Sequence, residues 1–388
     1  MYIEITEVSD LKDVDSIIKY CEMAVALDEK KLSLGIGKEE RRIHLSNLAA
    51  ALNNLGFMQF YSEEKANAFP FYKKAIIIQE HINDSIALGI SYLNIAHLYL
   101  ECFDTINAFS SFESAVKKTK LSKNRTVYFE SLYNLASLHL AKQNLLEAEK
   151  YCDEIIANSS GPEQNSSVYT AISTLASINC IKGDTLKAID LYKKSLEFSI
   201  KENDKTFTAG TYNDLGGIYR NQNNFVESEF YFKKGLKILD SLGEDGSLAI
   251  VLRNYSKLFL RQKNLKKAES LALQSMNHAK ESGSFKEIKY SAEILCQIYN
   301  SQKSNKAIEY CSLAKAMEDS VNKISKENKL FLDDFKKTYD SFDSDFIKKY
   351  DEIKPEAEEK SNLTLYIIGI SVLILLVGFY FYYKSKKG

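Results

Sequence analysis

The sequence predicts an all-α protein of stacked helical hairpins, followed by an amphipathic helix and one membrane-spanning helix. Three observations carry this prediction: a motif that recurs every 40 residues, an uncharged apolar segment near the C-terminus, and a composition poor in turn-forming residues. The 388 residues include only 3 prolines and 16 glycines, which leaves little room for a β fold with many turns.

Charge and cysteine usage exclude several classes of function. The chain has 51 Lys and Arg residues against 52 Asp and Glu, so its formal net charge is -1. Nucleic-acid-binding proteins usually carry a basic excess, and we therefore expect no nucleic-acid partner. The 6 cysteines form no CxxC or other close-spaced pair. This spacing predicts neither a zinc ribbon nor a disulfide framework.

The repeat is a gapless alignment of six segments, each starting 40 residues after the last. The segments contain a recurrent small residue, found at Gly56, Ala96, Ala136, Ala176, Gly216 and Ser256. A second small residue follows at Ala68, Ala108, Ala148, Ala188, Ser228 and Ala268, and four positions further on stand Tyr72, Phe112, Cys152, Tyr192, Phe232 and Ala272. Such spacings belong to helix faces, and we expect two antiparallel helices per unit. The small residues let the two helices approach, and neighbouring units must stack to bury their apolar faces.

The motifs carry a family resemblance. NNLGFMQF followed by Ala68, Tyr72 and Ala75, and NDLGGIYR followed by Phe232, resemble the tetratricopeptide repeat, over roughly residues 16 to 318. The usual member of that family has about 34 residues per repeat, so the extra residues here would lengthen the helices. The resemblance implies a right-handed superhelix, or solenoid, of about seven helical hairpins.

Both edges of the array depart from the pattern. A seventh unit, SAEILCQIYN with Ala307, Cys311 and Ala314, is one residue shorter in its turn. At the other edge, SIIKYCEMAVAL has the character of a second helix without its first. We therefore expect an array over residues 1–318 that starts in a partial repeat.

The resemblance also implies where a ligand would lie, because the first helix of each unit lines the concave wall. Asparagines recur at one position of these helices, at Asn54, Asn94, Asn134 and Asn254. Such a ladder can bond a peptide main chain, although the same asparagines also suit a water-facing consensus position. Phe57 and Tyr133 make the first half of the wall apolar, and the later half is basic at Arg220, Arg253, Lys257 and Arg261. The basic end suits an acidic ligand, or is simply a solvated face. The Lys, Asn and Arg set of the chaperone-binding relatives is not found here, so we expect no chaperone partner.

Signals for catalysis are weak. The 5 histidines are scattered, and the sequence has no HExxH, GxSxG, P-loop or GxGxxG motif. Cys21, Cys152 and Cys311 occupy equivalent second-helix positions, which indicates small-residue packing. We expect no catalytic residues, no metal ligands and no cofactor.

A stripe of large apolar residues marks the next segment, residues 319–354. Its members step by three and four positions: Phe331, Phe335, Tyr339, Phe342, Phe346, Tyr350 and Ile353. This amphipathic helix would cap the last repeat, or would self-associate as a juxtamembrane stalk. Pro355 opens a linker over residues 355–362.

Residues 363–383, LTLYIIGISVLILLVGFYFYY, contain no charge. At about 1.5 Å per residue they would span roughly 30 Å, the thickness of a bilayer core. A short basic tail, residues 384–388, follows and favours a cytoplasmic C-terminus. The N-terminal MYIEITEVSDLKD lacks the pattern of a signal peptide. We expect a single-pass protein of a bacterial inner membrane, with its repeats periplasmic if a signal peptide lies upstream and cytoplasmic otherwise.

Two functions remain open. The first is a membrane-anchored, non-catalytic scaffold that binds a protein or peptide in its concave groove. The second rests on the order of repeats, juxtamembrane helix and span, which is similar to the sensory halves of bacterial membrane signalling proteins. In that case the chain would be the input half of a sensor whose output domain is missing or separate.

Overall fold

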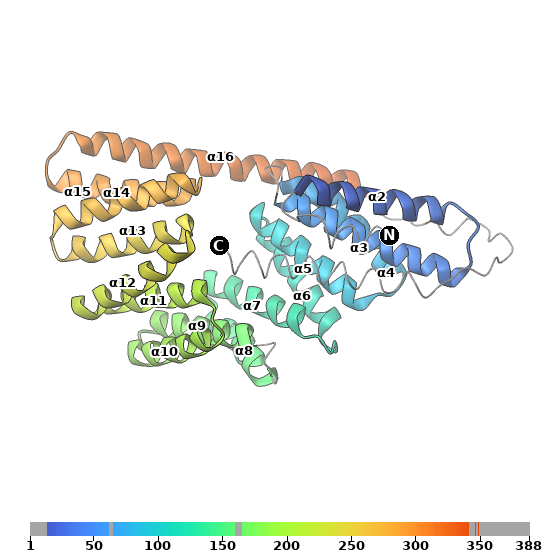
Figure 1. The fold of residues 1–388 in the computed structure, drawn as a ribbon, viewed down its shortest axis with the longest axis horizontal. Coiled ribbons are helices and arrows are strands. Elements are labelled where there is room, and N and C mark those ends of the chain that lie inside the picture. The colour runs from blue at the N-terminus through green and yellow to red at the C-terminus, as the bar shows by residue number, and fades with distance from the viewer. Residues whose placement is uncertain (1–13, 62–64, 160–164, 341–345, 347, 349–388) are drawn as a thin grey trace. The chain divides into compact units, whose positions relative to one another are not determined.

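The computed structural model describes residues 14–61, 65–159, 165–340, 346 and 348, and the regular elements within these ranges are all helical (Figure 1). The first helices of the hairpins are α3 (Lys38–Phe60), α5 (Ser85–Glu101), α7 (Thr126–Ala141), α9 (Asn165–Lys182), α11 (Lys205–Asn221), α13 (Asp245–Arg261) and α15 (Phe285–Ser301). Their second helices are α4 (Ala68–His81), α6 (Thr105–Thr119), α8 (Leu145–Asn158), α10 (Thr185–Lys201), α12 (Phe225–Leu242), α14 (Leu265–Glu281) and α16 (Lys306–Asp340). α2 (Val14–Leu32) precedes the first hairpin, and a 3-10 turn, η1 (Lys65–Asn67), precedes α4.

The chain divides into two compact units. The N-terminal unit holds the described residues up to Leu135 and those from Glu327 onward, and the C-terminal unit runs from Ala136 to Lys326. In the N-terminal unit, α2 packs on α3, and its Leu32 is fully buried with Leu45 and Leu48. The expected partial repeat is therefore a helix that covers the first complete hairpin.

The turns have one recurrent conformation. A residue with positive φ stands at every twentieth position from Gly183 to Lys303, that is at 183, 203, 223, 243, 263, 283 and 303. The next residue often caps the following helix: Asp204 accepts from the amide of Phe207, for example. Helices such as α11, α13, α14 and α15 have 17 residues each, and a three-residue turn between them completes a step of 20. Two such steps account for the period of 40 in the sequence.

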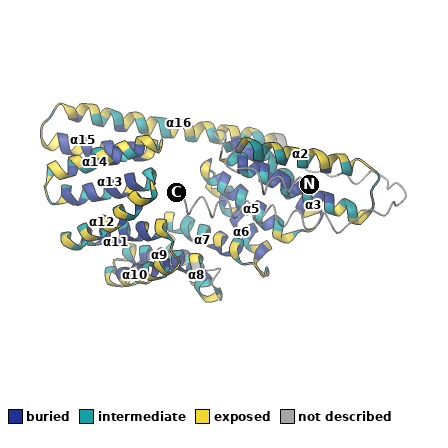
Figure 2. Ribbon diagram, viewed as in Figure 1, coloured by how far each residue is buried: buried dark blue, intermediate teal, exposed yellow. Residues whose placement is uncertain are grey.

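Within a hairpin, the recurrent small residue faces the aromatic residue of the second helix. A Cβ built on Gly56 would lie 2.7 Å from two ring carbons of Tyr72, and one on Gly216 would lie 2.9 Å from the ring of Phe232. The Oγ of Ser228 also donates a hydrogen bond of 2.7 Å to the carbonyl of Gly216. These contacts bury the seam between the two helices of these hairpins, whose facing residues are buried (Figure 2).

The last helix, α16, continues across residues 318 and 319 without interruption. Its first part is the second helix of the seventh hairpin, since the ring of Tyr310 stacks on that of Tyr299 in α15 at 5.3 Å and Lys289 pairs with Glu318 at 2.7 Å. The segment expected to begin at residue 319 is thus not a separate helix over residues 319–340, because it continues the second helix of the last repeat. Its capping of that repeat stays a prediction.

The second part of α16 belongs to the N-terminal unit. Leu332 is fully buried there, and the ring of Phe335 lies 6.5 Å from that of Phe69 in α4. Phe331, which the sequence places in the apolar stripe, is 45% exposed. The buried face of α16 is therefore displaced by one position from the expected stripe at this turn, because the packed neighbours select Leu332. Self-association through this helix stays a prediction.

A polar contact accompanies this packing. Lys336 forms an ion pair with Asp104, and its ammonium lies 4.8 Å above the ring centre of Tyr99. Burial acts against ionisation of Asp104, but hydrogen bonds from Lys336 and Asn107 outweigh it and hold the pKa of that carboxyl below its usual range. Phe346 is also buried in this unit, beside Leu32 and Leu45.

The predicted membrane span, residues 363–383, lies outside the described residues, as do the linker 355–362 and the tail 384–388. Among the helices that are described, none is both long and apolar enough to cross a bilayer.

Candidate functional site

The ten residues predicted to line a groove fall into two groups, one in each compact unit. The N-terminal unit contains Asn54, Phe57, Asn94, Tyr133 and Asn134. The C-terminal unit contains Arg220, Arg253, Asn254, Lys257 and Arg261. Each group is therefore described within its own unit.

Two of the predicted asparagines link neighbouring hairpins. The Nδ2 of Asn94 in α5 donates to the Oδ1 of Asn53 in α3 at 3.2 Å, and the Nδ2 of Asn254 in α13 donates to the Oδ1 of Asn213 in α11 at 2.9 Å. Each bond joins the first helices of successive units. The acceptors stand one position before the predicted ladder, and sequence reasoning missed them. Their recurrence at 53 and 213 was the available signal.

The other residues of the N-terminal group are partly buried. The Nδ2 of Asn134 donates to the carbonyl of Glu130 in its own helix at 2.9 Å. The ring of Phe57 meets that of Tyr61 edge to face at 4.9 Å. Asn54 and Tyr133 are half-buried on α3 and α7. These side chains lie on first helices as predicted, and their role in binding stays a prediction.

The C-terminal group contains a cationic cluster, which we define as Arg220, Arg253, Lys257 and Arg261. Arg220 comes from α11, and the other three occupy successive turns of α13. Burial and the charges of Arg261 and Arg253 lower the pKa of Arg220. Burial, Arg253 and Arg220 likewise lower the pKa of Lys257. The fold has therefore brought four positive charges close enough to repel one another.

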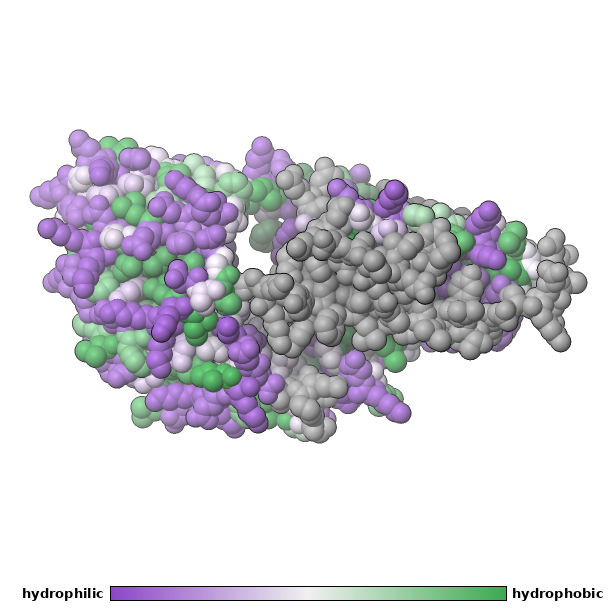
Figure 3. Space-filling view, viewed as in Figure 1, coloured by the Kyte–Doolittle hydropathy of each residue, from purple (hydrophilic) through white to green (hydrophobic). Residues whose placement is uncertain are grey.

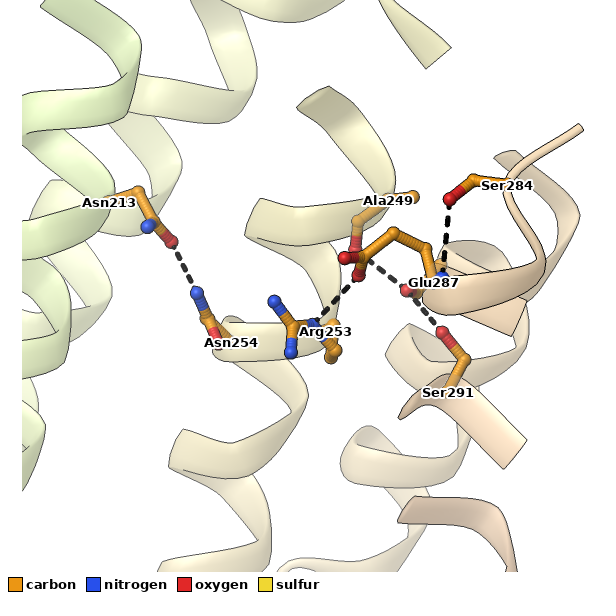
Figure 4. A network of polar contacts seen from close by, with 8 residues as sticks. Asn213, Ala249, Arg253, Asn254, Ser284, Glu287 and Ser291 are labelled. Carbon is orange, nitrogen blue, oxygen red and sulfur yellow. Dashed lines mark hydrogen bonds and ion pairs between the residues drawn. The ribbon is translucent and has the colours of Figure 1, made fainter. Parts of the chain in front are cut away.

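Within the described part of the chain, Arg253 is the only member of the cluster that contacts a carboxylate directly. Its Nε lies 3.1 Å from the Oε2 of Glu287 in α15 (Figure 4). Its guanidinium also lies 4.9 Å from the ring centre of Tyr290. Glu287 is buried, and its backbone amide donates to the Oγ of Ser284 at 3.3 Å. The spacing of Ser284 and Glu287 is that of a capping box, but the Glu side chain pairs with Arg253 instead. Sequence reasoning missed Glu287 because this pairing crosses between hairpins.

Neutral oxygen atoms hold the other two guanidinium groups. Arg220 donates through Nη1 to the carbonyl of Asn254 at 3.3 Å, and Arg261 donates through Nε to the Oδ1 of Asn223 at 2.8 Å. These bonds orient the side chains without cancelling their charge. The cationic cluster thus has more positive than negative charge, and an anionic group would relieve its repulsion.

At the ladder position of α11 the asparagine is replaced by Asp214. Burial raises the pKa of this carboxyl to about 7, and a hydrogen bond from Asn213 opposes the shift. A protonated carboxyl is neutral and can donate a hydrogen bond, as an Asn amide does. Asp214 therefore resembles the recurrent asparagines most closely below neutral pH.

The described residues contain no group of three or more His, Cys, Asp or Glu side chains able to hold a metal ion. His97, which the sequence places inside a first helix, meets the ring of Phe112 edge to face at 5.4 Å and lies 3.6 Å from Glu130.

Over α13 to α15 the surface in view is mostly hydrophilic, with small apolar patches (Figure 3). The feature with the clearest chemical meaning is the cationic cluster.

Comparison with known proteins agrees with this architecture. The family model of the tetratricopeptide repeat matches residues 166–241 and 207–281. No curated protein matches the chain. Among solved structures, the apo form of RapI is 14% identical with a TM-score of 0.58, covering 71% of this chain and 99% of that one. A Rap protein complexed with competence and sporulation factor is 12% identical with a TM-score of 0.50, covering 86% and 99%. A signal-transduction ATPase with a tetratricopeptide repeat sensor from Pyrococcus horikoshii is 16% identical with a TM-score of 0.52, covering 89% and 53%. The chain therefore has the fold of a tetratricopeptide-like helical repeat scaffold.

Proposed function

We propose that this protein is a non-catalytic scaffold that binds a protein or peptide, and that its C-terminal unit receives an acidic segment of that ligand at the cationic cluster. The observation that carries the proposal is the convergence of four cations, of which only Arg253 contacts a carboxylate, that of Glu287, within the described residues; the four are Arg220, Arg253, Lys257 and Arg261. Helical repeat scaffolds commonly bind extended segments along their surfaces.

The electrostatics of the cluster favour a carboxylate. Repulsion from Arg253 and Arg220 contributes to the lowered pKa of Lys257, so an anion placed between these groups would raise that pKa again. Guanidinium groups bind carboxylates through paired hydrogen bonds, which makes Arg suited to this task. The ring of Tyr290 lies 4.9 Å from the guanidinium of Arg253 and helps to hold that group through a cation–π contact.

The comparisons support a peptide or protein as the ligand class. One solved structure of similar fold is a Rap protein in complex with competence and sporulation factor. In the N-terminal unit, taken by itself, the predicted asparagines would contribute main-chain bonds to a peptide, with Phe57 and Tyr133 as apolar contacts; they are Asn54, Asn94 and Asn134.

The second candidate function is the input half of a transmembrane sensor. It is supported by α16, a continuous helix of 35 residues that begins as the second helix of the last hairpin and precedes the predicted span at 363–383 in the sequence. A solved ATPase of similar fold uses tetratricopeptide repeats as its sensor. In either case we propose a single-pass anchor in a bacterial inner membrane.

Charge reversal tests the proposed site. Lys257→Glu with Arg261→Glu reverses two members of the cluster and spares Arg253, whose reversal would bury a second carboxylate beside Glu287. A matched control reverses Lys237 and Lys266, which are exposed on the second helices α12 and α14 of the same unit.

The readout is fluorescence anisotropy with labelled peptides of equal length that are Glu-rich, neutral or Lys-rich. We expect the wild type to prefer the Glu-rich peptide, and the cluster variant to bind it at least about tenfold more weakly, with a smaller difference at high salt. The control should bind as the wild type does. Equal binding of all three peptides by the wild type would refute the cluster as an acidic-segment site.

A further inference from the structure

The repeat pattern places two cysteines face to face in the last hairpin. Cys296 stands 40 residues after Ser256 and so occupies the recurrent small position of the first helix. The last unit is one residue shorter than the others, and once this is taken into account Cys311 aligns with the aromatic position of the second helix. That position is occupied by Tyr72 in the first hairpin and by Phe232 in the fifth. In those hairpins a Cβ at the small position would point straight at the aromatic ring.

The missing residue does not disturb this register. Lys303 keeps its place in the series of positive-φ residues, and the amide of Ala307 bonds to the carbonyl of Ser304, three residues back, at 3.0 Å. The equivalent bond of Ala268 reaches four residues back, to Asn264. A tighter first turn of α16 thus absorbs the deletion and returns Cys311 to its position opposite Cys296.

The structure joins these two residues by a disulfide, with their Cα atoms 5.0 Å apart. That separation lies within the usual range of about 4.4 to 6.8 Å. Both residues are partly exposed. These two residues are therefore more open to solvent than the aromatic side chains at the equivalent positions of other hairpins, such as Tyr72 and Phe232.

We propose that Cys296 and Cys311 form a native, redox-responsive disulfide that locks α16 onto α15, and that a disulfide oxidant, either a protein disulfide or oxidised glutathione, introduces it. A thiolate of the pair attacks one sulfur of the oxidant and releases one thiolate. The second cysteine, after losing its proton to solvent, attacks the mixed disulfide and releases the other. The pair gives up two electrons and two protons, and the oxidant leaves as two thiols.

Asn300 favours this exchange. Its Nδ2 lies 3.5 Å from the Sγ of Cys296 and 3.6 Å from the Sγ of Cys311. An amide donor within reach of both sulfurs stabilises negative charge on whichever one becomes the thiolate when the bond opens or closes. The bond is therefore poised for exchange.

The remaining cysteines are poor competitors for the oxidant. Cys21, Cys102 and Cys152 are buried, and burial raises their pKa values to about 11, 11 and 12. Burial also raises the pKa of Cys180, which is partly exposed. The three buried side chains stay protonated at neutral pH, and the thiol form is a poor nucleophile. Oxidation should thus be confined to one pair.

The disulfide bears on the location of the repeats. Disulfides persist in the periplasm and other oxidising compartments and are rare in the cytosol. A bond that is present in the cell would therefore favour the periplasmic orientation of the array over the cytoplasmic one.

The first experiment uses the purified full chain in detergent, incubated in buffers of defined reduced and oxidised glutathione ratio and then alkylated. Peptide mass spectrometry should show Cys296 linked to Cys311 in oxidising buffer, with the other four cysteines alkylated once the chain is unfolded. Reduction should lower Tm by roughly 5 to 10 °C, the scale expected for opening a loop of this size. The Cys296→Ala, Cys311→Ala variant should show no such dependence on reductant.

A second variant separates the covalent bond from packing. The double variant Cys296→Gly, Cys311→Tyr recreates the pair found at Gly56 and Tyr72. It should fold, and its Tm should be the same with and without reductant. Two results with the purified protein would overturn the proposal: alkylation of both cysteines after oxidation, or a wild-type Tm that reductant leaves unchanged although the pair is fully reduced. Cells quenched with alkylating agent at harvest test the native state, where alkylation of both cysteines before reduction would also overturn it.

Discussion

Gly216 offers a sharp test of the hairpin packing. A Cβ at this position would lie 2.9 Å from two carbons of the Phe232 ring, which is fully buried. Carbon atoms in contact prefer about 3.5 to 4.0 Å, so the ring or the helix must shift by roughly 0.6 Å or more. Overpacking of this kind costs about 1 to 3 kcal/mol. Replacing Gly by Ala within a helix returns up to about 1 kcal/mol through propensity.

Gly210, on the same helix α11, is the matched control. It is exposed, and a Cβ built on it meets no atom within 4 Å. Gly210→Ala should therefore stabilise the chain by about 0.5 to 1 kcal/mol. The two substitutions are chemically identical, so the difference between them isolates the contact with Phe232. That difference should be about 1 to 3 kcal/mol, with Gly216→Ala the less stable.

The assay is thermal and urea unfolding of both variants, followed by far-UV circular dichroism. A difference of 1 kcal/mol should move Tm by about 2 to 4 °C for a unit of this size. If Gly216→Ala proved as stable as Gly210→Ala, the assigned register between small and aromatic residues would be refuted.

Three further outcomes are expected. Asp104→Asn keeps the helix cap but loses the ion pair with Lys336, and should lower the free energy of unfolding by about 1 to 2 kcal/mol at pH 7. The pKa of Asp104 is lowered in the folded state, so the stability that its charge contributes is lost as the pH falls below that pKa. Urea titrations should therefore show the difference in unfolding free energy between wild type and variant vanish at low pH. A difference that stays constant with pH would contradict the ion pair of Asp104 with Lys336. Asp214→Asn should stabilise the chain by up to about 4 kcal/mol at pH 8, because the raised pKa makes the folded state lose about 1.4 kcal/mol per pH unit between about pH 4 and pH 7; no gain at pH 8 would refute burial of the charge. Full-length protein should resist carbonate extraction from membranes while a version ending at Ser361 does not, and release of both would exclude a span at residues 363–383.

The sequence was most informative where a contact repeats. The register of the motif predicts that the small residue faces the aromatic residue, as Gly56 faces Tyr72 and Gly216 faces Phe232. The prediction succeeds because the same two motif positions pack against each other in both hairpins. Clustering of Arg253, Lys257 and Arg261 follows likewise from their spacing on one helix face.

Contacts between hairpins were less predictable. The bond of Asn254 to Asn213 and the pairing of Arg253 with Glu287 depend on how one unit stacks on the next. The motif alone does not determine how far each hairpin is rotated relative to the next. In α16, the choice of Leu332 over Phe331 as the buried residue was set in the same way, by neighbours distant in sequence.

The disulfide was missed for a different reason. A scan for closely spaced cysteines overlooks a pair separated by 15 residues. The repeat alignment contained the signal, because Cys296 and Cys311 fall at the two positions that meet in the hairpins of Gly56 and Gly216.

The affinity ratio between matched Glu-rich and Lys-rich peptides tests the central claim most directly, measured by isothermal titration calorimetry on the wild type and on the variant with Lys257→Glu and Arg261→Glu. Reversal of the charges in the cluster should reverse the preference: the wild type should favour the Glu-rich peptide, and the variant the Lys-rich one. An unchanged preference in the variant, with its helical content and Tm equal to those of the wild type, would contradict the assignment of the cationic cluster as the binding site.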